Sequence, residues 1–85
     1  MEVVYSKKAK EDIAFWKNSG NKKLMAKTSE LISAIELHPF EGIGKPEPLK
    51  HNLTGCWSRR INQEHRIVYE VEGDKILIHS LKGHY

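Results

Sequence analysis

The 85-residue sequence contains a single cysteine, Cys56, and no long apolar run. One cysteine cannot form a disulfide within the chain, and it excludes the thiolate clusters that hold structural zinc or iron and sulfur. The longest apolar runs, such as residues 76–78, fall far short of the roughly 20 residues that span a bilayer. Met1 is not followed by the basic and apolar stretch of a secretory signal, so we expect a cytoplasmic protein.

Glycine and proline are also scarce, with six and three residues, which argues against a disordered or fibrous chain. Apolar residues make up 39% of the sequence and charged residues 29%, as in an ordinary globular protein. A chain of this length buries only about 60–65% of its unfolded surface. We therefore expect residues 1–85 to form one domain with a thin core.

The charge is mildly basic, with a net charge of +3. That excess alone does not specify a partner, because many ordinary proteins share it. The second half interleaves basic residues with aromatic ones: Lys45, Lys50, Arg59, Arg60, Arg66 and Lys82 with Trp57, Tyr69, His84 and Tyr85. This mixture suits a polyanion with stackable bases, such as RNA.

The first half predicts a short strand and a helix hairpin. Residues 3–5 favour a strand, and Ser6 can cap a helix that ends at Gly20. A second helix stops before Pro39, because the residue ahead of a proline is pushed out of helical geometry. The apolar faces of the two helices are Ala9, Ile13 and Trp16, and then Leu24, Thr28, Leu31, Ile32 and Ile35.

The second half predicts a loop and an antiparallel meander. Glycines and prolines between residues 39 and 48 exclude a regular element there. Residues 57–61, 66–71 and 75–81 are rich in branched or aromatic side chains and are separated by polar turns. The predicted fold is therefore α+β, with an N-terminal strand and helix hairpin packed on a mainly antiparallel sheet.

The two-residue turn at Gly73 and Asp74 sets a register for the last hairpin, with Tyr69 opposite Ile78 and Arg66 opposite Leu81. One face then carries apolar residues for the helices to cover: Ile67, Tyr69, Val71, Ile76 and Ile78. The other face carries Arg66, Val68, Glu70 and His79. The same count sends His84 and Tyr85 about 10 Å past the residue opposite Arg66, so a modest bend would bring them to it.

RNA supplies its own nucleophile, the 2'-hydroxyl, so cleavage needs only a base, an acid and positive charge around the phosphate. Glu47 lies between two prolines that restrict its backbone, His84 offers an imidazole, and Arg66 offers a guanidinium. The plain alternatives remain open: a solvated loop glutamate, a frayed tail and a solvated sheet face.

Metal and thiol chemistry have less support in the sequence. The five histidines show neither the close helical spacing nor the neighbouring carboxylates typical of metal ligands. Cys56 stands at a strand start ahead of Trp57, which favours packing over a role as nucleophile.

Three sequence blocks follow one another in the second half: KPEPLKHNL at residues 45–53, WSRRI at 57–61 and EHRIVY at 64–69, and the chain ends in HY. Together they resemble the YoeB or Txe family of toxins, within the wider RelE and ParE superfamily. The close match runs from residue 39 to 71, and the helices agree only in pattern.

The resemblance implies a helix hairpin on a twisted sheet, a ribosome-dependent messenger RNA endoribonuclease without a metal or other cofactor, and a cognate antitoxin of the YefM or Axe type. It leaves a homodimer open. It implies that Glu47 is the general base, Arg66 stabilises the transition state and His84 is the general acid. It further implies contacts to phosphate, ribosomal RNA or messenger from Lys50, Arg59, Arg60 and Tyr85.

The sequence departs from the family pattern at Cys56, where a larger apolar or aromatic residue is expected, and at residues 81–83, where an arginine and an aromatic are frequent. Two other functions remain open. The chain could inhibit a protein such as DNA gyrase, as ParE relatives do, or it could be a plain RNA-binding module; neither needs a base and an acid.

Overall fold

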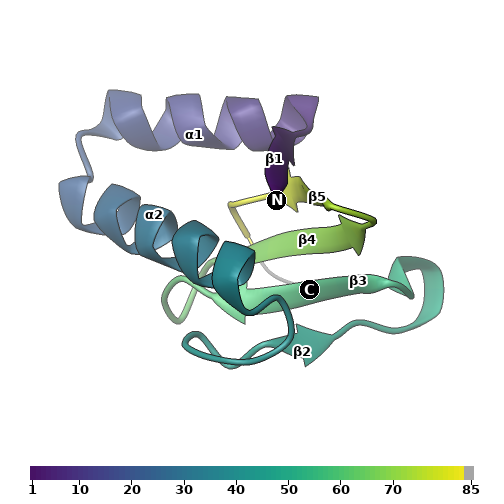
Figure 1. Ribbon diagram of the computed structural model, residues 1–85. Coiled ribbons are helices and arrows are strands. Elements are labelled where there is room, and N and C mark those ends of the chain that lie inside the picture. The colour runs from purple at the N-terminus through teal and green to yellow at the C-terminus, as the bar shows by residue number, and fades with distance from the viewer. Residues whose placement is uncertain (84–85) are drawn as a thin grey trace.

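The computed structural model describes residues 1–83, which form two helices and a five-stranded sheet (Figure 1). The elements are β1 Glu2–Tyr5, α1 Lys7–Ser19, α2 Lys22–Leu37, β2 Glu47–Pro48, the 3-10 turn η1 His51–Leu53, β3 Cys56–Arg60, β4 Arg66–Glu72 and β5 Lys75–Ser80. The strand order is β1-β5-β4-β3-β2, with β1 parallel to β5 and all other neighbours antiparallel. The predicted α+β class is confirmed. No helix of the described part is long and apolar enough to cross a membrane.

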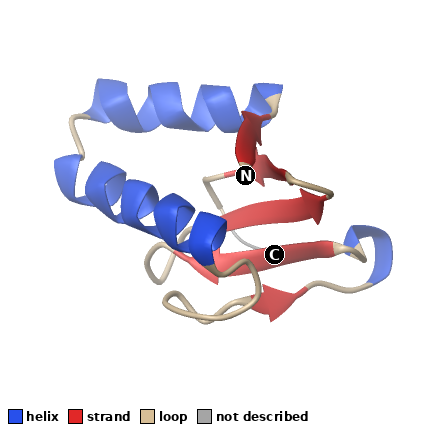
Figure 2. Ribbon diagram, in the orientation of Figure 1, coloured by secondary structure: helices blue, strands red, loops and turns tan. Residues whose placement is uncertain are grey.

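Both helices begin and end where local sequence signals place them. The Ser6 side chain accepts a hydrogen bond from the Ala9 N–H at the start of α1, and Gly20 ends the helix in the left-handed conformation that glycine adopts without strain. The Asn21 side chain caps α2, which ends at Leu37, two residues before Pro39. The helices form a hairpin (Figure 2).

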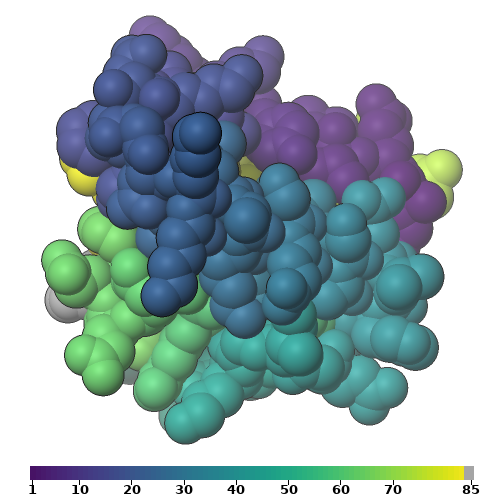
Figure 3. Space-filling model, turned by 90° about the vertical axis from the view of Figure 1, so that its left-hand side faces the viewer, coloured from purple at the N-terminus to yellow at the C-terminus, as the bar shows by residue number. Residues whose placement is uncertain are grey.

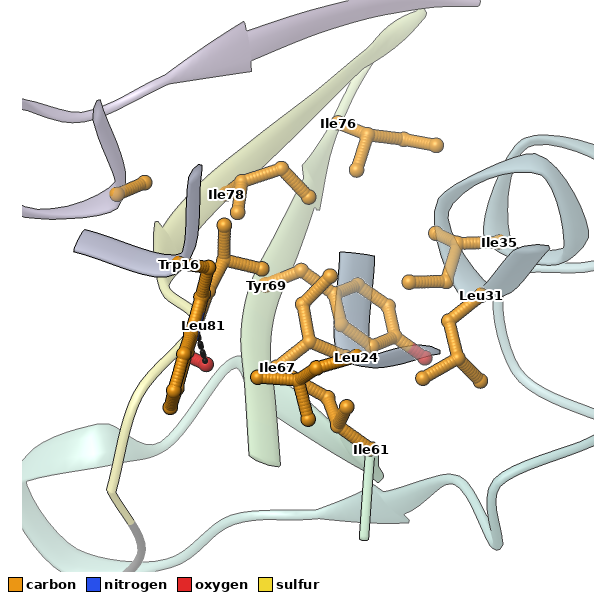
Figure 4. Packing of buried hydrophobic residues seen from close by; sticks show 11 residues of the cluster. Trp16, Leu24, Leu31, Ile35, Ile61, Ile67, Tyr69, Ile76, Ile78 and Leu81 are labelled. Carbon is orange, nitrogen blue, oxygen red and sulfur yellow. Dashed lines mark hydrogen bonds between the residues drawn. The ribbon is translucent and has the colours of Figure 1, made fainter. Parts of the chain in front are cut away.

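The core lies between this hairpin and one face of the sheet. Leu24, Leu31 and Ile35 of α2 pack with Trp16 of α1 against a fully buried apolar set from the sheet, Ile67, Tyr69, Ile76 and Ile78 (Figure 4). The prediction of the helix-covered face is confirmed for these four residues, whereas Val71 is only half-buried. The face of the sheet away from the helices is called the open face below.

The last hairpin contains a β-bulge that the predicted register missed. Tyr69 pairs with Ile78 as expected, but Val68 pairs with Ser80, so His79 has no partner in the ladder. A bulge moves the following residues by one position. The predicted pairing of Arg66 with Leu81 is therefore wrong. Leu81 instead joins the core, fully buried, and the Arg66 N–H donates to the Gly83 carbonyl at 2.9 Å.

The sequence predicted no helix or strand between residues 39 and 48. This prediction is wrong for the last two residues of that range. Glu47 and Pro48 form β2, which pairs with Ser58 and Trp57 of β3. β2 is an edge strand, where a proline is tolerated because no further strand needs its missing N–H. Glu47 therefore has a defined place in the sheet.

Candidate active site

The open face of the sheet carries three of the residues expected to act on RNA. Glu47 of β2 pairs with Ser58 of β3, and Arg60 of β3 pairs with Arg66 of β4. Paired residues of an antiparallel ladder project on the same side, and successive residues alternate between sides. Because Trp57 packs against the core, its neighbour Ser58 faces away from the helices, as do the side chains of Glu47, Arg60 and Arg66.

The spacing of these residues fits a nucleotide phosphate. Arg60 is diagonal to Glu47 across the β2–β3 ladder, at about 7–8 Å between Cα atoms. Arg66 lies two strands and two residues away, which corresponds to about 12 Å. Glu47 and Arg60 are exposed and Arg66 is half-buried. Lys50 is also exposed, just before η1. A carboxylate and two guanidinium groups can thus approach one phosphate from different sides.

The chain after β5 returns to Arg66 through two hydrogen bonds at Gly83. The Arg66 N–H donates to the Gly83 carbonyl at 2.9 Å, and the Gly83 N–H donates to Nδ1 of His65 at 2.9 Å. Gly83 is the last described residue. The predicted site residues His84 and Tyr85 follow it in the sequence and lie outside the described residues.

Helix α1 anchors the beginning of the segment that follows β5. The sequence did not predict this contact. Asp12 is 4% exposed, and its carboxylate accepts hydrogen bonds from the Leu81 N–H at 2.9 Å and from the Lys8 ammonium at 2.7 Å. The Trp16 indole N–H donates to the Leu81 carbonyl at 3.4 Å. The segment that leads to His84 is therefore fixed at Leu81 and again at Gly83.

We expect Asp12→Ala to lower the free energy of unfolding by about 1–3 kcal/mol, because it leaves the buried Leu81 N–H without an acceptor. Chemical denaturation of the variant measures this. Glu11→Ala is the matched control, since its side chain is exposed and one position earlier on the same helix; its cost should stay within about 0.5 kcal/mol. Equal stabilities for the two variants would contradict the anchoring role of Asp12.

Arg59 is not on the open face, contrary to the expected RNA contact. It is 0% exposed, and its guanidinium donates to the carbonyls of His38, Glu41 and Ile43 and to the Tyr69 hydroxyl. The Tyr69 hydroxyl donates in turn to the Pro39 carbonyl at 2.6 Å. Burial raises the pKa of Tyr69, although the neighbouring arginine opposes the shift. Arg59 thus holds the loop between α2 and β2, and its buried guanidinium offers no exposed group for the predicted RNA contact.

Two further side chains of the open face lie near Glu47. Ser58, its ladder partner, is 1% exposed, and its hydroxyl has no hydrogen-bond partner among the described residues. Cys56 lies two residues before Ser58, and burial, with a smaller contribution from the Glu70 carboxylate, raises the pKa of its thiol. A raised pKa disfavours the thiolate at neutral pH, which agrees with the expectation that free Cys56 is not a nucleophile.

His79 has a carboxylate neighbour, although the sequence suggested none for any histidine. Its Nε2 lies 2.9 Å from Oε1 of Glu70, within hydrogen-bonding distance. The sequence separation of nine residues spans the β4–β5 turn, so helical spacing rules could not find the pair.

A groove on the helix side of the molecule is separate from these residues. It lies between α2 and the β3–β4 turn, which are blue and green in Figure 3. Its lining includes Lys23, Leu24, Lys27, Ile61 and Asn62, and neither Glu47 nor Arg66. On the open face of the sheet, by contrast, Glu47 and Arg60 are exposed and Arg66 is half-buried, which suits a large substrate presented on another surface.

Comparison with known proteins finds relatives that match along the whole chain. The profile of the family described as "YoeB-like toxin of bacterial type II toxin-antitoxin system" matches residues 5–85. Toxin YoeB of Escherichia coli K12 is 47% identical over 85 residues, covering 100% of both chains.

Solved structures give the same result. A YoeB/ParE toxin from Agrobacterium tumefaciens is 38% identical with a TM-score of 0.96 over 100% of both chains. The toxin chain of a YoeB-YefM complex from Staphylococcus aureus is 48% identical with a TM-score of 0.90, covering 100% of this chain and 98% of the other.

Proposed function

Because this chain belongs to the YoeB-like toxins of bacterial type II toxin-antitoxin systems, we propose that it is a ribosome-dependent endoribonuclease that cuts messenger RNA. The observation that best supports this activity is the shared position of Glu47, Arg60 and Arg66 on the open face, with Gly83 hydrogen-bonded to Arg66. This arrangement provides a carboxylate, two fixed positive charges and a chain segment that leads to an imidazole.

The proposed reaction is an attack by the RNA on its own backbone. Glu47 takes the proton of a 2'-hydroxyl, whose oxygen bonds to the adjacent phosphorus while the bond from phosphorus to the 5'-oxygen breaks. Arg66 stabilises the added negative charge on the phosphate. His84 gives a proton to the leaving 5'-oxygen. The products are a 2',3'-cyclic phosphate, or its opened form, and a 5'-hydroxyl, and we expect tolerance for either purine at the cut.

Substrate binding is assigned to the charges that remain exposed. Arg60 lies diagonal to Glu47 on β3, and Lys50 follows β2 just before η1. Neither makes an ion pair within residues 1–83. Tyr85 supplies an aromatic ring for stacking on a base. Arg59 is left out of this set because of its burial.

A YefM-like antitoxin is the proposed protein partner, as in the complex from Staphylococcus aureus. Exposed Arg60 and half-buried Arg66, paired across β3 and β4, form a basic surface that attracts an acidic, partly disordered segment. Such a segment would cover the proposed catalytic residues and stop cleavage by occupying the phosphate position.

We expect cleavage of messenger on translating ribosomes and very little cleavage of the same RNA free in solution. A face without a deep cleft cannot hold a flexible RNA in place, so the ribosome must present it. Mapping RNA ends with translating ribosomes, idle ribosomes and naked RNA measures this. Equal rates with and without ribosomes would contradict the dependence.

The same experiment tests the other functions. A protein-directed inhibitor, such as a gyrase inhibitor, would produce no new RNA ends in any sample. A plain RNA-binding module would bind without cutting. Binding to ribosomes should also weaken steeply with added salt, because phosphate contacts release counterions.

A further inference from the structure

Three potential metal ligands from three neighbouring strands meet on the open face. They are Cys56 of β3, Glu70 of β4 and His79 of β5, and one ligand atom from each lies within 4.8 Å of the other two. Cys56 and Glu70 are direct ladder partners, and His79 is the residue expelled by the β-bulge. Bulges redirect side chains, and this one places the imidazole beside Glu70 at 2.9 Å.

We propose that Cys56, Glu70 and His79 bind a zinc ion. Zinc takes thiolate, imidazole and carboxylate ligands at about 2.0–2.3 Å in a tetrahedral arrangement, which requires about 3.4–3.6 Å between ligand atoms. The three ligand atoms already lie within 4.8 Å of one another, so rotation of the side chains can bring them to that spacing without a change in strand pairing. The mixed set of one soft and two harder ligands matches zinc better than magnesium or calcium, which take oxygen ligands.

The site has three protein ligands, so the fourth position of the ion remains available to water or to a donor from a bound molecule. Cys56 lies diagonal to Glu47 across the β2–β3 ladder, on the side opposite Arg60, at about 7–8 Å. A bound zinc ion would add positive charge beside the proposed general base. It would also join β3, β4 and β5, which should stabilise the sheet. The proposed cleavage uses none of the three ligands.

Titration of the reduced full-length protein with cobalt(II), followed by displacement with zinc, tests the proposal without any activity measurement. We expect a thiolate-to-cobalt charge-transfer band in the near ultraviolet that zinc removes. Zinc at about 100 times its Kd should raise Tm by about 10–20 °C, since an ion that binds only the folded state stabilises it.

Each ligand has a specific expected effect. Cys56→Ser should abolish the charge-transfer band. His79→Gln and Glu70→Gln should each weaken zinc binding by at least about tenfold, because even residues that only support a ligand typically contribute about 10–100-fold. His38→Gln is the matched control: this imidazole also has a carboxylate neighbour, Glu41 at 3.9 Å, but no thiol, so its loss should change nothing.

Circular dichroism without metal shows whether each variant folds. Absence of the band in the folded parent protein would overturn the proposal. So would unchanged zinc affinity in His79→Gln and Glu70→Gln, which would place the ion elsewhere, or loss of binding in His38→Gln.

Discussion

Replacement of Arg59 by alanine is expected to lower the free energy of unfolding by about 3–5 kcal/mol, a large part of the roughly 5–15 kcal/mol typical of a folded domain. The guanidinium is fully buried and donates to three carbonyls of the loop after α2 and to the Tyr69 hydroxyl. Its removal leaves the buried Tyr69 hydroxyl and the part-buried loop carbonyls without their donor, and it opens a cavity near Leu31 and Gly44.

Arg60→Ala is the matched control, because Arg60 is the next residue on β3 but is exposed on the open face. Its cost in stability should stay within about 0.5 kcal/mol. Urea denaturation of both variants and the parent measures the difference. In ribosome binding the order should reverse: the Arg60 variant should bind more weakly, and Arg59→Met, if it folds, should bind nearly as well as the parent. Similar stabilities for Arg59→Ala and Arg60→Ala would contradict the structural role.

The different roles of these two arginines could have been predicted in part. Period-two alternation places Arg59 on the same face as Trp57 and Ile61, which are apolar, and Arg60 on the other face. The resemblance treated both arginines alike and outweighed this local signal. The carbonyls that Arg59 binds could not be found, since they belong to an irregular loop 16–21 residues earlier.

Local signals predicted the helices well because caps and breakers act within a few residues: Ser6, Gly20 and Pro39 fix the ends of α1 and α2. The β-bulge at His79 has no such signal, because nothing in the residues around it demands an unpaired position. The bulge then determines the positions of several residues at the site. It buries Leu81, brings Gly83 to Arg66 and places His79 beside Glu70, and none of these contacts follows from regular hairpin counting.

The buried Asp12 shows the same limit in α1. The apolar face predicted for this helix did not include Asp12, but its carboxylate accepts the Leu81 N–H from 69 positions later. A contact at that separation depends on the whole fold, so only the structure reveals it.

Replacement of Glu47 by glutamine is expected to slow single-turnover cleavage of ribosome-bound messenger by about 10²–10⁴-fold, because the amide keeps the shape of the side chain but cannot take the 2'-hydroxyl proton. Arg66→Ala should cost about 10²-fold or more through lost stabilisation of the phosphate. Removal of His84 and Tyr85 should cost about as much as Glu47→Gln, since it takes away the proposed acid and a base contact.

The stability of these variants separates catalysis from folding. Glu47 is exposed on an edge strand, so Glu47→Gln should leave unfolding and ribosome affinity nearly unchanged. Glu72→Gln is its control, because it removes the same charge from an exposed position at the far end of β4, and it should cut at the parent rate. The Arg66 variant keeps its backbone bond to Gly83, which needs no side chain.

Combining the changes gives a stricter test of the proposed proton transfer. If Glu47 and His84 act on the same phosphate in one step, the effects of Glu47→Gln and of the two-residue truncation should be strongly non-additive, because either loss disables the same transition state. Independent contributions would instead multiply. Cleavage close to the parent rate in both folded, ribosome-bound variants would exclude Glu47 and His84 as the base and acid, and inhibition of a protein target would then explain toxicity better.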